Sequence, residues 1–228
     1  MRAPSILVRP FLLLVLLSLS FAALGQGAST QQSYRWEYAG RTWTLTHSFS
    51  TEHYRFFRTL PRNLDYADYP DYVDDPRDDT QLQSLIDALE RLAADAGMDA
   101  WAKLNLVIAF VQSIPYAGES CEYPRYPLET LVERQGDCED AAILASALLR
   151  QMRFDVVLLA FLEEQHMALG IRVLPPTPAE HPPYAWNGDS YYYLEPTTTG
   201  WEIGDVPAMY RSQPRILPFS SVLASTGR

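Results

Sequence analysis

The chain has 228 residues, a formal net charge of −10 and a single lysine, Lys103. This excess of carboxylates argues against nucleic acid and anionic membranes as partners, because both carry negative charge. The length and the 47% share of hydrophobic residues are enough for one well-buried globular unit.

Residues 1–25 have the layout of a secretory signal peptide. Arg2 and Arg9 precede an apolar run over 11–24, which ends among small residues before Gly25. The run has 14 residues, fewer than the roughly 20 that span a bilayer, so a retained membrane anchor is the weaker alternative. We therefore expect cleavage near Gly25, a periplasmic or secreted product, and no stable membrane insertion afterwards.

Residues 26–99 are expected to form an N-terminal extension that packs on a core of residues 100–228. Apolar and polar residues alternate over 34–45 around Ala39-Gly40, which predicts a β-hairpin. Asp and Tyr recur every third residue over 65–75. Calcium loops need a different spacing and a glycine turn, so we expect a solvated loop there.

Two amphipathic helices follow this loop. Apolar residues recur at helical spacing over 80–96, where Gly97 ends the pattern. A second helix is predicted from Asp99 to the residues before Pro115, so that the two form a helical hairpin. A short helix is predicted over 127–134.

Cys138 is the strongest candidate for a nucleophile. It stands in Gly136-Asp137-Cys138-Glu139-Asp140, and the apolar run over 143–152 predicts a buried helix behind the cysteine. The positive end of the helix dipole and unpaired backbone N–H groups favour the thiolate there. Cys121, the only other cysteine, leaves two alternatives open in an oxidising compartment. One is a structural disulfide with Cys138, and the other is a labile disulfide that holds an enzyme inactive until it is reduced.

A base and a carboxylate follow the cysteine in chain order. Residues 155–161 and 166–173 predict two antiparallel strands, with a third over 191–194 after a proline-rich loop. His166 opens the second strand and Glu195 ends the third, so Cys138, His166 and Glu195 are a candidate catalytic triad. The other histidines lie in the N-terminal region and in the proline-rich loop: His47, His53 and His181.

Three ordered motifs resemble the transglutaminase-like superfamily of papain-related thiol enzymes: Gly136-Asp137-Cys138, His166-Met167-Ala168 and Leu194-Glu195-Pro196-Thr197. The longer sequence over 136–140 is similar to bacterial transglutaminase-like cysteine proteinases, some of which are periplasmic and calcium-dependent. The resemblance covers roughly residues 100–207. It departs from the family pattern at Glu195, where aspartate is usual and the longer side chain requires a slightly shifted strand.

The resemblance implies an α+β fold with a transglutaminase-like, papain-like core, in which the nucleophile helix packs on an antiparallel sheet. The N-terminal β-hairpin and the helical hairpin would be added to this core. We expect no cofactor and no metal. In the calcium-dependent relatives the matching acids are implicated in metal binding, whereas Asp137, Glu139 and Asp140 are expected to cap the helix and complement its dipole.

We therefore expect a secreted cysteine peptidase that acts on peptide or protein amides. Cys138 would attack the carbonyl carbon, His166 would transfer the proton and Glu195 would orient the imidazole. The backbone N–H of Cys138 would bind the oxyanion, with a second donor from one of three residues: Gln112, Tyr116 or Gln135. A protein-glutamine transferase or deamidase is the near alternative, because it shares the acyl-enzyme. A non-catalytic binding module of the bacterial envelope is the alternative from another class.

Overall fold

The computed structural model describes residues 27–179 and 181–220, and the predicted signal peptide, residues 1–25, lies outside them. In chain order the elements are β1 (Ser29–Tyr38), β2 (Arg41–Ser50), α1 (Thr51–Thr59), η1 (Tyr66–Asp68), α2 (Pro70–Asp74), α3 (Asp79–Asp95), α4 (Ala100–Gln112), α5 (Pro127–Glu133), α6 (Cys138–Gln151), β3 (Val156–Phe161), β4 (His166–Ile171), β5 (Tyr184–Trp186), β6 (Asp189–Leu194) and β7 (Arg215–Pro218). Helices and an antiparallel sheet share one hydrophobic core, which confirms the predicted α+β class. Within the described ranges, no helix combines the length and the apolar character needed to span a bilayer.

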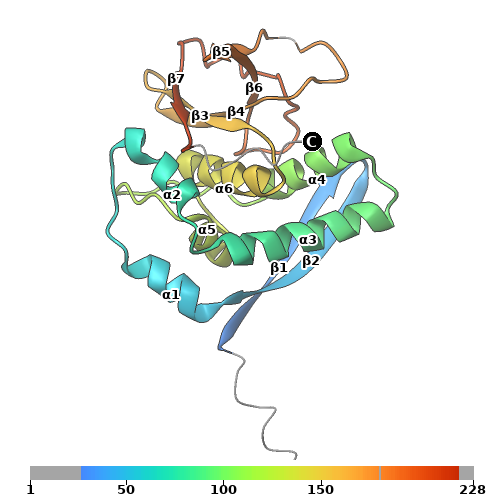
Figure 1. Ribbon diagram of the computed structural model, residues 1–228, viewed down its shortest axis with the longest axis vertical. Helices are drawn as coiled ribbons and strands as arrows, with labels where there is room; N and C mark the ends of the chain where they lie inside the picture. The colour runs from blue at the N-terminus through green and yellow to red at the C-terminus, as the bar shows by residue number, and fades with distance from the viewer. Residues whose placement is uncertain (1–26, 180, 221–228) are drawn as a thin grey trace, which may run out of the picture.

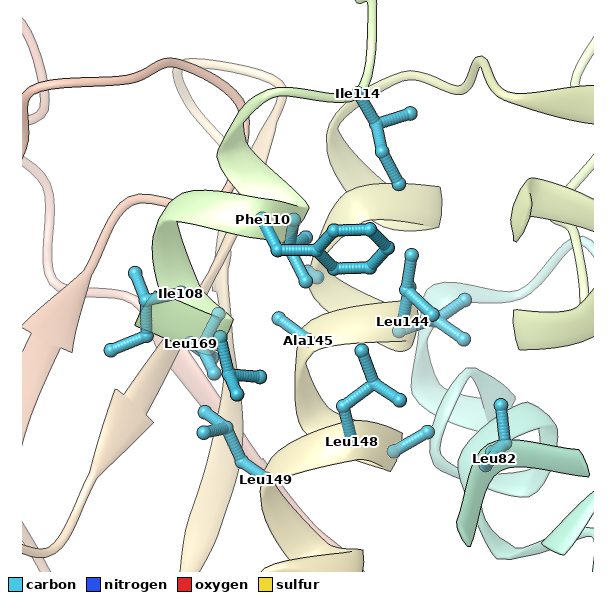
Figure 2. Packing of buried hydrophobic residues seen from close by; sticks show 14 of the residues in the cluster. Leu82, Ile108, Phe110, Ile114, Leu144, Ala145, Leu148, Leu149 and Leu169 are labelled. Atoms are coloured by element: carbon cyan, nitrogen blue, oxygen red, sulfur yellow. The ribbon is translucent and has the colours of Figure 1, made fainter. Parts of the chain in front are cut away.

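Helix α6, which begins at Cys138, lies at the centre of the molecule. Helices α2 to α5 and strands β3 and β4 all contact it, and Figure 1 shows the sheet above α6 and the β1–β2 hairpin below it. Figure 2 shows Leu144 and Leu148 of α6 among core residues of three other elements, Leu82 of α3, Phe110 of α4 and Leu169 of β4. Burial of one such side chain contributes about 1.5–3 kcal/mol. The core therefore fixes α6 and with it the position of its first residue.

The five-stranded sheet has the order β5-β6-β4-β3-β7, and all its neighbouring strands are antiparallel. Its inner face packs on α6, whereas its outer face carries a separate apolar group. We call this group the outer-face cluster; it consists of Val157, Leu159, Phe161, Ala168, Tyr184, Tyr191 and Tyr193. Because side chains alternate along a strand, His166 shares the outer face with Ala168, and Glu195 shares it with Tyr193. The candidate base and its carboxylate thus lie at the ends of adjacent strands, on one face.

The β1–β2 hairpin forms as the alternation predicts. Ala39 and Gly40 have φ angles of 51° and 70°, the left-handed conformation that a two-residue type I′ turn needs. Tyr34 and Trp36 of β1 pack edge-on against Phe110 of α4, with ring centroids 5.0 and 5.3 Å apart. The hairpin thus shares the main hydrophobic core with α6.

Some elements differ from the sequence-based expectations. The prediction of a solvated loop over 65–75 is wrong, because this segment forms η1 and α2 and buries Tyr69, Tyr72 and Val73. Helix α1 was not predicted; its N-cap is Ser50, whose side chain accepts a hydrogen bond from the backbone N–H of His53. Strands β5 and β7 were not predicted either, and they form the two edges of the sheet.

Candidate active site

Gly136 and Asp140 shape the turn that places Cys138 at the first position of α6. A Cβ on Gly136 would lie 2.6 Å from the Cβ of Asp140, so only glycine allows this close approach. The Asp140 carboxylate accepts hydrogen bonds from the backbone N–H groups of Asp137 and Arg125, at 3.3 and 2.6 Å. Cys138 is therefore the first residue of α6, at the helix end where the backbone N–H groups lack partners within the helix.

Arg125 is the counter-charge beneath this turn. It is only 7% exposed and pairs with the fully buried carboxylate of Asp140. Its guanidinium also pairs with Glu133, at 2.9 Å, and with Glu119. Asp140 thus has the structural role expected of it, and the buried negative charge of the turn depends on Arg125 for compensation.

The thiol of Cys138 lies among carboxylates. Its Sγ donates to Glu139 Oε2 at 3.3 Å, and no hydrogen bond within the described residues joins it to His166. Burial raises the pKa of the Cys138 thiol and the Glu139 carboxylate raises it further, while a hydrogen bond with the backbone of Met167 opposes them. Burial and the neighbouring Asp137 likewise raise the pKa of Glu139 to about 9.

His166 has a well-defined partner. Its Nε2 lies 3.0 Å from Oε2 of Glu195, which also accepts a 2.6 Å hydrogen bond from the Tyr193 hydroxyl. The other oxygen, Oε1, accepts from the backbone N–H of Thr197 at 3.1 Å and from its hydroxyl at 2.6 Å. Burial opposes ionisation of Glu195, but the hydrogen bonds from His166, Thr197 and Tyr193 outweigh it and hold its pKa below the usual range.

Cys138 and His166 line one cleft of about 410 Å³. The remaining lining residues are mostly apolar or aromatic, apart from two acids and a glutamine: Leu64, Tyr66, Tyr69, Glu122, Glu139, Ala160, Phe161, Leu162, Gln165 and Met167. The structure therefore brings the predicted nucleophile and base to the same opening, with Glu195 bound to the far side of the imidazole.

The three suggested oxyanion donors have different surroundings. Gln112 is buried, and its side-chain amide donates to the backbone carbonyls of Glu195 and Trp201, at 2.8 and 3.1 Å. It holds the backbone that carries Glu195, so its donors are already used. Gln135 is exposed to solvent. The backbone of Tyr116 forms an isolated parallel β-bridge with Gly136, just before α6. Burial and the charges of Cys138 and Asp137 raise the pKa of Tyr116, so its hydroxyl keeps its proton and can donate a hydrogen bond.

Sequence reasoning missed three residues of the site. Tyr193 stands two residues before Glu195 on the same strand face, so alternation alone could have indicated it. Thr197 belongs to the motif that identified Glu195, yet its role as a double donor was not predicted. Tyr210 stacks on the His166 ring from a loop without periodicity, and no sequence signal indicates it.

Cys121 and Cys138 are both free, so the structure contains no disulfide between them. Among the described residues no three His, Cys, Asp or Glu side chains gather as metal ligands do. Within the described part of the chain, Asp137 Oδ1 is buried without a hydrogen-bond partner. Asp140 forms an ion pair with Arg125. Asp137 and Glu139 supply two carboxylates, whereas Ca²⁺ takes roughly 6–8 oxygen ligands, which can include backbone carbonyls and water.

Comparisons with known proteins give distant similarities of fold. No protein-family model matches the chain, and no curated protein matches it. Among solved structures, LapG of Legionella pneumophila after EGTA treatment matches with 20% identity and a TM-score of 0.38, covering 75% of this chain and 81% of that one. Calcium-bound LapG matches with 20% identity and a TM-score of 0.35, covering 72% and 80%.

A candidate cysteine protease from Cytophaga hutchinsonii also matches. The identity is 13% and the TM-score 0.34, over 75% of this chain and 65% of that one. These similarities concern the fold, and the function is argued below from the site.

Proposed function

We propose that this protein is a cysteine peptidase that hydrolyses peptide or protein amides through Cys138, His166 and Glu195. The proposal is carried by the hydrogen bond between His166 and Glu195, in the cleft that also contains a cysteine at the start of a buried helix. Nucleophilic catalysis requires a nucleophile, a base and a group that orients the base. The arrangement of these three residues supports the proposal.

The hydrogen bond to Glu195 assigns the two imidazole nitrogens. With the Nε2–H of His166 donated to the carboxylate, Nδ1 is the nitrogen free to accept a proton. The thiol of Cys138 must turn from Glu139 towards this nitrogen before transfer. Hydrogen bonds of this kind are often loose without substrate and tighten when it binds.

The reaction then proceeds through an acyl-enzyme. The Cys138 proton passes to Nδ1 of His166, and the thiolate forms a C–S bond with the amide carbon. The backbone N–H at the start of α6 and the Tyr116 hydroxyl would stabilise the oxyanion. The C–N bond breaks as His166 protonates the leaving amine, and water then hydrolyses the thioester with His166 as the base.

Export is part of the proposal. Residues 1–25 have the composition of a signal peptide, so we infer that the mature enzyme acts in the periplasm or outside the cell on a peptide or protein substrate. Fractionation of cells that produce the full chain tests this directly. A cytoplasmic product that retains its first 25 residues would contradict it.

Peptide hydrolysis tests the activity. The mature chain is incubated with denatured proteins and a peptide library, and mass spectrometry identifies new termini and any deamidated glutamine. New termini that disappear in both Cys138→Ala and His166→Ala support a peptidase. Deamidation or ammonia release without cleavage would instead indicate a transferase or deamidase, and turnover in neither assay would leave a binding module.

A further inference from the structure

The ring of Tyr210 lies flat on the imidazole of His166. The ring centroids are 4.2 Å apart and the two planes differ by 8°. Tyr210 belongs to the long connection between β6 and β7, whereas His166 opens β4, so the contact is tertiary. An aromatic ring in this position covers one face of the base.

The outer-face cluster holds the Tyr210 ring in place. Phe161 lies 5.6 Å from it and Tyr193 lies 6.5 Å from it, measured between centroids. Tyr193 also donates to Glu195, so the ring that supports Tyr210 also fixes the carboxylate that orients His166. The imidazole is therefore oriented at its edge by a hydrogen bond and over its face by a stacked ring.

Glu164 anchors the segment that carries Tyr210. Its carboxylate accepts hydrogen bonds from the backbone N–H groups of Arg211 and Ser212, at 3.0 and 2.9 Å, and from the Ser212 hydroxyl, at 2.5 Å. Glu164 lies two residues before His166, so one short segment supplies both the base and the anchor. This ties the position of Tyr210 to that of His166.

A single hydrogen bond at Nε2 leaves the imidazole free to tilt about that bond. Tilting would swing Nδ1 away from the thiol of Cys138. We propose that Tyr210 is a positioning residue, whose aromatic ring holds the His166 imidazole in the plane from which Nδ1 accepts the Cys138 proton. This inference rests on the proposed function, and it assigns the effect to the ring and not to the hydroxyl.

Two substitutions separate the ring from the hydroxyl. Tyr210→Leu removes the stack and should lower kcat by about 10- to 100-fold while KM changes by less than about threefold, because misplaced reacting groups mainly affect the chemical step. Tyr210→Phe keeps the stack and should stay within about threefold of the wild type in both constants. Glu164→Ala, which releases the anchor but keeps the ring, should lower kcat in the same direction by a smaller factor.

The stacking of Tyr210 on His166 can be measured from a proton chemical shift, without an activity assay. The Cε1 proton of His166, assigned with His166→Ala, should resonate upfield because of the Tyr210 ring current. The upfield shift should persist in Tyr210→Phe and be lost in Tyr210→Leu. Tyr38→Leu, a partly buried tyrosine of the hairpin, is the matched control for folding and should leave the His166 resonance and kcat unchanged.

Three results would overturn the inference. An unchanged kcat in Tyr210→Leu would show that the ring does not matter, and an equal loss in Tyr210→Phe would assign the effect to the hydroxyl. An unshifted His166 resonance in the wild type would show that the stack is absent in solution. Failure of the proposed function looks different, since hydrolysis would then be absent or would persist in Cys138→Ala whatever residue stands at 210.

Discussion

Two buried carboxylates lie beside the candidate catalytic groups, and their surroundings are opposite. Glu195 is 2% exposed and accepts hydrogen bonds from Tyr193 and Thr197 besides its bond with His166, which hold its pKa below the usual range. Glu139 is 7% exposed and lies between another carboxylate and the Cys138 thiol; burial and the Asp137 charge raise its pKa to about 9. Negative charge is thus stabilised on the base side of the cleft and opposed on the nucleophile side.

This difference indicates where the site is preorganised. The base side can stabilise an imidazolium, because the ionised carboxylate of Glu195 is hydrogen-bonded to Nε2 of His166. On the nucleophile side the Cys138 thiolate must form next to acidic side chains, so the imidazolium and the N-terminus of α6 have to offset its charge. The account therefore requires that His166 and Cys138 ionise together as a pair.

Replacing Glu195 with glutamine would break the base side and is expected to have the largest effect. The amide cannot accept from His166, Tyr193 and Thr197 as the carboxylate does, and it no longer stabilises an imidazolium. Peptide hydrolysis should fall by about 10,000-fold in kcat, the loss seen when a triad acid is replaced by its amide. Glu52→Gln, an exposed acid of α1, is the matched control. A loss below about threefold would show that the carboxylate does not orient the base.

Replacing Arg125 with methionine would break the support beneath the nucleophile side. Asp140, fully buried, would lose its counter-charge, so the free energy of unfolding should fall by about 3–5 kcal/mol, measured by urea denaturation. Arg172→Met removes a surface pair with Asp155 and should cost no more than about 1 kcal/mol. Equal losses in the two variants would contradict the buried role of Arg125.

Replacing Glu139 with glutamine tests the nucleophile side, and we expect it to have the smallest of the three effects. The amide side chain is uncharged, so above about pH 9, where Glu139 is ionised, the charge that helps to raise the thiol pKa of Cys138 would be gone. Alkylation of Cys138 should become about tenfold faster at about pH 10, which corresponds to one unit in the thiol pKa, and should change little at neutral pH, where Glu139 is largely protonated. Glu163→Gln, exposed in the β3–β4 turn, is the control. A profile that does not move would show that burial alone sets the thiol pKa.

The periodicity of apolar residues was sufficient to predict those helices and strands whose apolar faces pack on the core. The alternation over 34–45, the helical spacing over 80–96 and the apolar run behind Cys138 all predict elements that the structure contains. Strand β7, with four residues and a proline at its end, carries no such pattern and is formed by its pairing with β3. The acidic run over 65–75 folds because its tyrosines find a buried surface that the sequence does not reveal.

The candidate site shows the same limit. The ordered motifs identified Cys138, His166 and Glu195, and the structure places the first two on one cleft. The bond from Tyr193 to Glu195 follows from strand alternation once β6 is known. The stack of Tyr210 on His166 depends on how an irregular segment crosses the sheet, so no spacing rule could predict it.

The most direct test of the account is the rate at which iodoacetamide alkylates Cys138 from roughly pH 4 to 9, compared between the wild type and His166→Ala. The label is located by peptide mass, so that exposed Cys121 serves as the internal reference. The account predicts fast labelling of Cys138 near neutral pH that is lost in His166→Ala, while Cys121 is unaffected. Slow labelling of Cys138 that is the same in both proteins would contradict an activated thiol and with it the proposed peptidase.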